Sequence, residues 1–270
     1  MKNLKVLLAT GIVTALATFL PATSHAAQGG TSILHLLIRE TMTSTGADTN
    51  ASGRVEAKQN KQGRSNHQQL NISANNLDAS APFQLLALLG DDTNFTHVAD
   101  LTSDVDGKIA VRYRRVDAGN GNGHGNGPKL GRGKSPLPAV LNPVTNIREL
   151  AIQNASTQAV LTADFSAPDK FEYLIKRPLT NDGFDSDAAG TLRIKGNGNH
   201  ATIRIAASNL ETNAAYFLVL NSSINETNTT DATGKLTAAT SLLTPTDILD
   251  LRTLSISDTA SNSVLSAKLP

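Results

Sequence analysis

The residue types most able to bind a ligand form one basic and one acidic group. The basic group starts on an expected strand and continues into a Gly- and Asn-rich segment, and it consists of Arg112, Arg114, Arg115, Lys129, Arg132 and Lys134. Clustered Lys and Arg attract anionic polymers through their summed electric field. The sequence therefore predicts a surface for an acidic polysaccharide or another polyanion. The alternative is a solvated strand face followed by a soluble loop.

The acidic group is the segment 182–187, in which Asp182, Asp185 and Asp187 lie close together in sequence. Calcium favours carboxylate and carbonyl oxygens held in a loop of this kind. The spacing does not match the calcium loop of an EF-hand, and Asp side chains also bond their own backbone in turns. Calcium is thus one interpretation, and turn formation is the other.

No pattern in the chain marks a catalytic site. There is no Gly-x-Ser-x-Gly nucleophile motif, and the segment 131–135 lacks the first Gly of a phosphate-binding loop because Pro128 occupies that position. His67 and His200 have no second His or Cys at metal-ligand spacing. We therefore expect a protein that is not an enzyme and has no cofactor. A secreted hydrolase with an unrecognised site is the alternative.

The first 27 residues have the three zones of a secretory signal. Lys2 and Lys5 precede an apolar run over residues 6–20, and small residues follow it, with cleavage expected after Ala26 or Ala27. The apolar run is too short for a permanent membrane span. The sequence predicts a protein secreted to the periplasm or the extracellular space, with no membrane span.

Composition is consistent with export from a bacterium. The chain has no Cys, whereas small secreted eukaryotic domains usually depend on disulfides. Its 24 basic residues, less the two lysines of the signal, leave 22 against 23 acidic residues, so net charge indicates no class of partner.

The remaining sequence reads as two copies of one module, residues 32–166 and 167–270. The matches keep their order along the chain while the offset between them shrinks. They include Leu37-Ile38-Arg39 with Leu174-Ile175-Lys176, Asn76-Leu77 with Asn209-Leu210, Asp104 and Gly107 with Asp231 and Gly234, and Arg148 with Arg252. The offset shrinks most across a Gly/Asn-rich basic loop at 117–142, which we expect to be mobile and exposed.

Apolar residues alternate with polar ones in short segments of each copy, as in Leu70-Asn71-Ile72. This is the period of a strand with one wet face. About eight strands are expected in the first copy, near 34–42, 54–59, 68–74, 83–89, 95–101, 108–114, 147–153 and 159–165. The fold class is thus predicted as all-β, with two tandem β-sandwich-like modules of short antiparallel strands produced by internal duplication.

Function is only broadly constrained by this architecture, which resembles the sandwich modules of exported bacterial surface and matrix proteins. Such folds host many functions. We expect a structural or interaction protein of the bacterial envelope or extracellular matrix, with the polyanion-binding module as an alternative. A short turn joins strands 160–165 and 171–176. Their pairing, repeated between molecules, would give self-association through the terminal strands.

Overall fold

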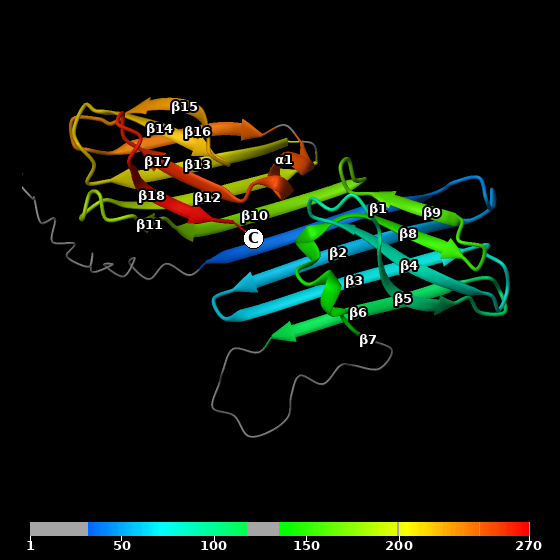
Figure 1. The fold of residues 1–270 in the computed structure, drawn as a ribbon. Coiled ribbons are helices and arrows are strands. Elements are labelled where there is room, and N and C mark those ends of the chain that lie inside the picture. The colour runs from blue at the N-terminus through cyan, green and yellow to red at the C-terminus, as the bar shows by residue number, and fades with distance from the viewer. Residues whose placement is uncertain (1–31, 118–134, 199, 243, 270) are drawn as a thin grey trace, which may run out of the picture.

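The structure is a computed structural model that describes residues 32–117, 135–198, 200–242 and 244–269 (Figure 1). Strands account for nearly all of its regular elements, so the predicted all-β class is confirmed. The expected signal segment, residues 1–27, lies outside the described residues. Within the described ranges, no helix has the length and apolar character needed to cross a membrane.

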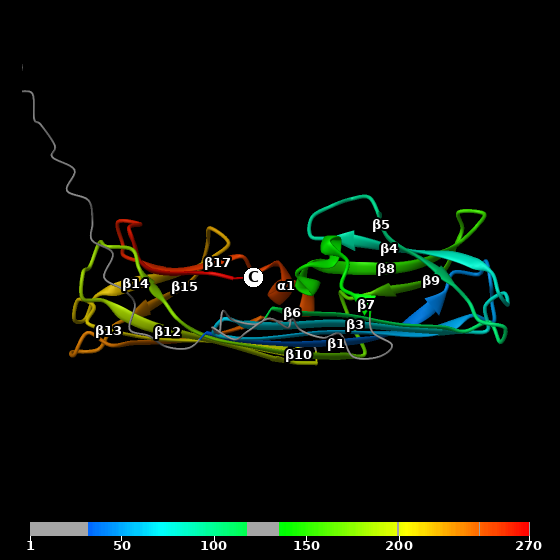
Figure 2. The same ribbon diagram turned by 90° about the horizontal axis from the view of Figure 1, so that it is seen from below.

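One long sheet runs the length of the molecule and forms its lower layer in Figure 2. Its first strand in sequence, β1, lies at the centre of the sheet, with strands of the first half of the chain on one side and strands of the second half on the other. In spatial order the strands are β16 (Leu236–Leu242), β13 (His200–Ser208), β12 (Ala189–Asn197), β10 (Lys170–Pro178), β1 (Ile33–Ser44), β2 (Ser52–Gln62), β3 (Ser65–Asn75), β6 (Ile109–Asp117) and β7 (Ser135–Pro136).

Two smaller sheets form the upper layer, one over each half of the long sheet (Figure 2). The first has the order β5 (Thr96–Thr102), β4 (Pro82–Leu89), β8 (Ile147–Asn154) and β9 (Ala159–Asp164), and β9 also pairs with the end of β1. The second has the order β15 (Ser223–Thr229), β14 (Ala215–Leu220), β17 (Thr253–Ser257), β18 (Ser263–Lys268) and β11 (Thr180–Asn181). The same order of hydrogen-bonded strands therefore occurs in both halves.

Pairing of β1 with β10 joins the two halves. The strands are antiparallel from Ile33 opposite Lys176 to Arg39 opposite Lys170, with Leu36 opposite Tyr173 at the centre. The predicted pairing of 160–165 with 171–176 is wrong, because β9 pairs with β8 and β1 instead. Since β1 has a strand on each side, it offers no free edge for the expected self-association through terminal strands.

Alternation along the strands divides the long sheet into a buried inner face and an exposed outer face. On β12, Leu192 and Ile194 are fully buried between the layers while Arg193 and Lys195 are exposed. Burial of one such Leu or Ile side chain contributes about 1.5–3 kcal/mol to stability. The apolar alternation thus holds the layers together and leaves the outer face to polar residues.

The predicted loop 117–142 is in part a structured element. Residues 118–134 lie outside the described residues, but 135–142 continue through β7 into the short 3₁₀ helix η1 (Ala139–Leu141), where Leu141 is fully buried. The buried side chain of Gln68 holds the segment that follows, donating to Asn142 Oδ1 (2.6 Å) and accepting from the backbone N–H of Val144 (2.9 Å), which begins the 3₁₀ helix η2 (Val144–Asn146). Residues 135–142 are thus only partly exposed: Ser135, Pro136, Ala139 and Val140 are exposed, whereas Leu137 and Leu141 are buried.

Matching turns connect the two layers in both halves. Asp104 Oδ1 accepts the backbone N–H groups of Asp106 and Lys108, and the carbonyl of Gly107 accepts the N–H of Leu77 at 3.0 Å. Asp231, Gly234 and Leu210 make the same bonds in the second half. The turn at Asp104–Gly107 does not close a hairpin, because β5 pairs with β4 whereas β6 pairs with β3.

The short helix α1 (Pro245–Asp250) links the halves in the upper layer. Thr244 and Asp247 cap its first turn reciprocally. Arg148 of β8 donates to the carbonyl of Leu249 (3.1 Å) and to the carboxylate of Asp250 (2.5 Å), and Arg252 donates to the same Leu249 carbonyl. These charged bonds attach the end of the helix to the first half of the chain.

Candidate polyanion-binding face

The outer face of the long sheet carries many more basic than acidic side chains. Parity along each strand assigns residues to this face, and its cationic members are Arg39, Arg54, Lys58, Arg112, Arg114, Lys170, Lys176, Arg193, Lys195 and Arg204. Within the described strands of this face, the acidic members are Glu56 and Glu172. Because the whole chain is nearly neutral, the two layers differ in charge.

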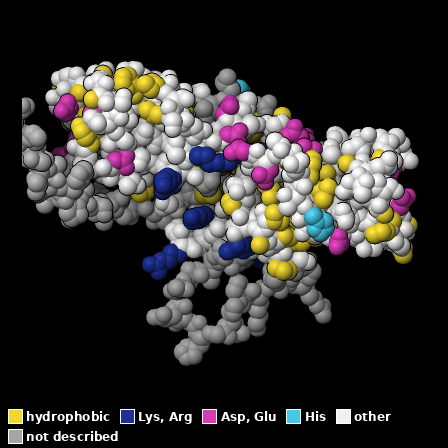
Figure 3. Space-filling view, in the orientation of Figure 1, with side chains coloured by type: hydrophobic (Ala, Val, Ile, Leu, Met, Phe, Trp, Pro, Cys, Tyr) yellow, Lys and Arg dark blue, Asp and Glu magenta, His cyan; other side chains and the backbone are white. Residues whose placement is uncertain are grey.

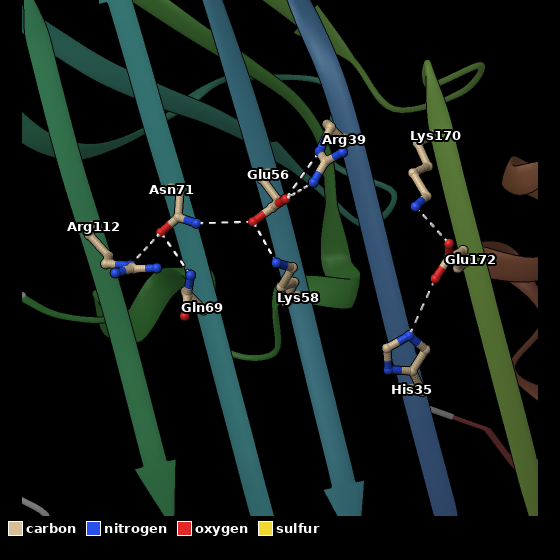
Figure 4. Close-up of polar contacts among 9 residues, drawn as sticks. All are labelled: His35, Arg39, Glu56, Lys58, Gln69, Asn71, Arg112, Lys170 and Glu172. Carbon is tan, nitrogen blue, oxygen red and sulfur yellow. Dashed lines mark hydrogen bonds and ion pairs between the residues drawn. The ribbon is translucent and has the colours of Figure 1, made fainter.

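In the first half, acidic and amide groups engage much of this positive charge (Figure 4). Arg39, Glu56, Asn71 and Arg112 lie directly opposite one another on four consecutive strands. Glu56 accepts two bonds from Arg39 (2.6 and 3.0 Å) and pairs with Lys58 at 2.7 Å. Asn71 in turn donates to Glu56 and accepts from Arg112. This network ties the strands together and reduces the net charge of the first half.

Titration of the two carboxylates reflects their cationic neighbours. Burial raises the pKa of Glu56, but hydrogen bonds from Lys58 and Arg39 outweigh it, and the pKa is lowered overall. The hydrogen bond from Lys170, with a smaller contribution from His35, lowers the pKa of Glu172. The neighbouring cations therefore favour the ionised form of both carboxylates.

The structure divides the predicted basic group. Arg112 and Arg114 lie on the outer face of β6, whereas Arg115 follows the opposite parity, directly across from the inner-facing Gln68. Lys129, Arg132 and Lys134 lie outside the described residues. Only the two outer arginines thus share a surface in the described structure.

In the second half, positive side chains stand together in one row across the sheet. Lys176 of β10 lies directly opposite Arg193 of β12, which lies directly opposite Arg204 of β13, and all three are exposed on the outer face. We call these residues the cation row. Lys195 lies beside it on the same face of β12. None of these four cations has an anionic partner among the described residues, so their charge is available to a ligand.

The cation row is unfavourable for the sheet itself. Like charges directly opposite each other on neighbouring strands destabilise a sheet, and strands are separated by only about 4.8 Å. Unfavourable local arrangements, such as like charges side by side, are often found at functional sites. The row therefore resembles a binding surface more than a structural feature.

Sequence reasoning missed the cation row because its members are scattered along the chain. Arg193 and Lys195 are two residues apart on an expected strand, so the sequence alone could have placed both on one face. The positions opposite them depend on the register of β12 with β10 and β13, which alternation does not determine.

The three predicted calcium-binding aspartates separate into a pair and a single residue. The Asp182 carboxylate accepts from Ser263 and Ser266 of β18. Asp185 and Asp187 line a hollow of about 640 Å³ with Tyr216 of β14. Burial, and then the neighbouring Asp187, raises the pKa of Asp185. In the described ranges, no three acidic or His side chains lie close enough to hold a metal ion, and calcium binding stays a prediction.

Comparison with known proteins adds no family. The chain matches no protein-family model and no curated protein sequence.

Proposed function

We propose that this chain is an exported, non-enzymatic protein that binds an anionic polymer on the outer face of its long sheet. The observation that carries the proposal is the cation row, in which Lys176, Arg193 and Arg204 are aligned, exposed and without acidic partners among the described residues. Binding of an anionic polymer is consistent with a structural or interaction role in the bacterial envelope or the extracellular matrix.

The form of the surface favours an extended ligand. The outer face is a broad sheet spanning both halves, and the cations recur on it at the spacing of neighbouring strands. A polymer that carries a charge on each repeating unit can contact several of them at once and release its counterions. Acidic polysaccharides and other polyanions share this property.

We also propose that each half is a β-sandwich-like module and that the two arose by internal duplication. Support comes from the shared strand order and from the matching turns at Asp104 and Asp231. The pairing of Leu36 with Tyr173 adds to it, since these two residues correspond when the copies are aligned at Leu37 and Leu174. The two halves are thereby related by an approximate two-fold axis between β1 and β10.

Retention on immobilised heparin, a sulfated polysaccharide, tests the polyanion proposal. The triple variant with Lys176, Arg193 and Arg204 changed to Gln should elute at lower salt than the unaltered protein. With each contact contributing about 0.7–0.9 to the slope of log affinity against log salt, the slope should fall by about two to three. Unchanged retention would overturn the proposal.

A second triple variant controls for lost charge. Changing Lys129, Arg132 and Lys134 to Ala removes the same formal charge from the predicted basic group. A larger loss of heparin retention in this variant than in the cation-row variant would place the binding site in segment 129–134. Equal losses would indicate attraction by net charge alone. Turnover of ester, glycoside or peptide substrates by the purified protein would instead favour the hydrolase alternative.

A further inference from the structure

A small pocket lies on the inner face of the long sheet, where the two halves meet. Its volume is about 290 Å³, and it is lined by the start of β1, the end of β2, the end of β10 and the residues that end β18. Binding sites for small molecules usually measure about 300–1,000 Å³. The pocket is therefore of a size for a small ligand, and it is separate from the outer face.

Its lining combines an apolar floor with a cationic rim. Leu34 and Ile175 lie opposite each other on β1 and β10 and are buried, while Ile33 and Leu269 are half-buried at its margin. The remaining lining residues are Ser32, Lys61, Arg177 and Lys268. Because this lining contains three cations and no acidic residue, it favours an anion.

Figure 3 shows the same charge from outside. The view is of the face that carries the smaller sheets, and its Lys and Arg side chains gather near the middle, around the C-terminal end of β18. Acidic side chains are more scattered over this face. The pocket thus opens where positive charge is concentrated.

Arg177 has donors to spare at this position. Its Nη1 donates to the carbonyl of Lys268, whereas its buried Nε has no acceptor among the described residues. A buried donor without a partner costs about 1–3 kcal/mol. A ligand carboxylate beside the guanidinium would form a charged hydrogen bond of the strong type that Arg makes with anions.

We propose that this pocket binds a small amphipathic carboxylate, with its hydrocarbon part on Leu34 and Ile175 and its carboxylate among Lys61, Arg177 and Lys268. An inorganic anion would leave the apolar floor in contact with water, and a neutral hydrocarbon would leave the cations without an acceptor. A carboxylate with a short alkyl chain satisfies both parts of the lining. This proposal is independent of the polyanion site.

Calorimetric titration with octanoate tests the site, and octanol is the neutral ligand of similar size. Octanoate should bind to the exported protein at least tenfold more tightly than octanol. The double variant Lys61→Gln, Lys268→Gln changes exposed side chains and should fold normally, and it should weaken octanoate binding at least fivefold. Equal binding of octanol, or unchanged octanoate binding by the double variant, would overturn the proposal.

Lys176→Gln provides a matched control, because Lys176 is adjacent to Arg177 in sequence but lies on the outer face. It should leave octanoate affinity within twofold while lowering retention on heparin. Methyl NMR shifts induced by octanoate should be largest at Leu34 and Ile175. Shifts confined to other methyl groups would also overturn the assignment.

Discussion

Removing the central charge of the cation row should make the protein more stable. Arg193 faces Lys176 on one side and Arg204 on the other. Two unit charges about 6 Å apart in water repel each other by about 0.7 kcal/mol. Arg193→Gln relieves two such repulsions, although flexible side chains diverge, so the expected gain in the free energy of unfolding is about 0.5–1.5 kcal/mol.

Urea unfolding at low and high salt measures this gain. In a chain of this size it corresponds to a rise in melting temperature of about 1–6 °C, and it should shrink by more than half in 1 M salt, where the Debye length is about 3 Å. Lys195→Gln is the matched control, since Lys195 faces Leu174 and Thr202 rather than cations. It should alter stability by less than about 0.5 kcal/mol.

A loss of stability in Arg193→Gln, or a gain that salt does not diminish, would refute this reasoning. Such a result would mean that the Arg193 side chain supports the sheet through its aliphatic stem. The same variant should also elute earlier from heparin, so stability and binding are expected to change in opposite directions.

Three other variants test the framework around the site. Gly107→Ala should cost at least about 2 kcal/mol by urea unfolding, because Gly107 has φ +70° and a Cβ would lie 2.1 Å from the carbonyl oxygen of Leu77; a loss below 0.5 kcal/mol would contradict the turn geometry. Glu56→Gln should lower stability by about 1 kcal/mol at pH 7, measured by urea unfolding. The pKa of Glu56 is lowered in the folded protein, so the loss should be fully present above the unfolded pKa and should shrink as pH falls through the folded pKa. A loss that does not shrink as pH falls would contradict that assignment. Arg148→Met should cost about 1.5–3 kcal/mol and increase amide hydrogen exchange in α1, because Arg148 holds the Leu249 carbonyl; unchanged exchange in α1 would argue against the link.

Local pattern predicted the fold class better than the site. Alternation in segments such as Leu70-Asn71-Ile72 identified strands and their buried sides. The same parity requires Arg114 and Arg115 to lie on opposite faces, so their separation was predictable from sequence. The cation row was not, because cross-strand neighbours depend on the register of β12 with β10 and β13, which alternation alone does not determine.

Interactions at long range account for the other differences. The short turn between β9 and β10 suggested that these strands pair, but a turn also suffices to carry the chain from one layer to the other. In the segment 182–187, two serines of β18 hold Asp182, and nothing nearby in sequence indicates them. Buried Gln68 likewise anchors the segment at 142–144 from a distant strand.

Because β1 and β10 join the halves within one chain, the surface residues of one half can differ from those of the other. Two separate chains meeting through the same strand would associate only at sufficient concentration, and a symmetric pair would have to carry identical surfaces. Here the contact is intramolecular, so its strength does not depend on the concentration of the protein. In the first half of the shared sheet Glu56 neutralises positive charge, while in the second half Arg193 stays exposed between two other cations.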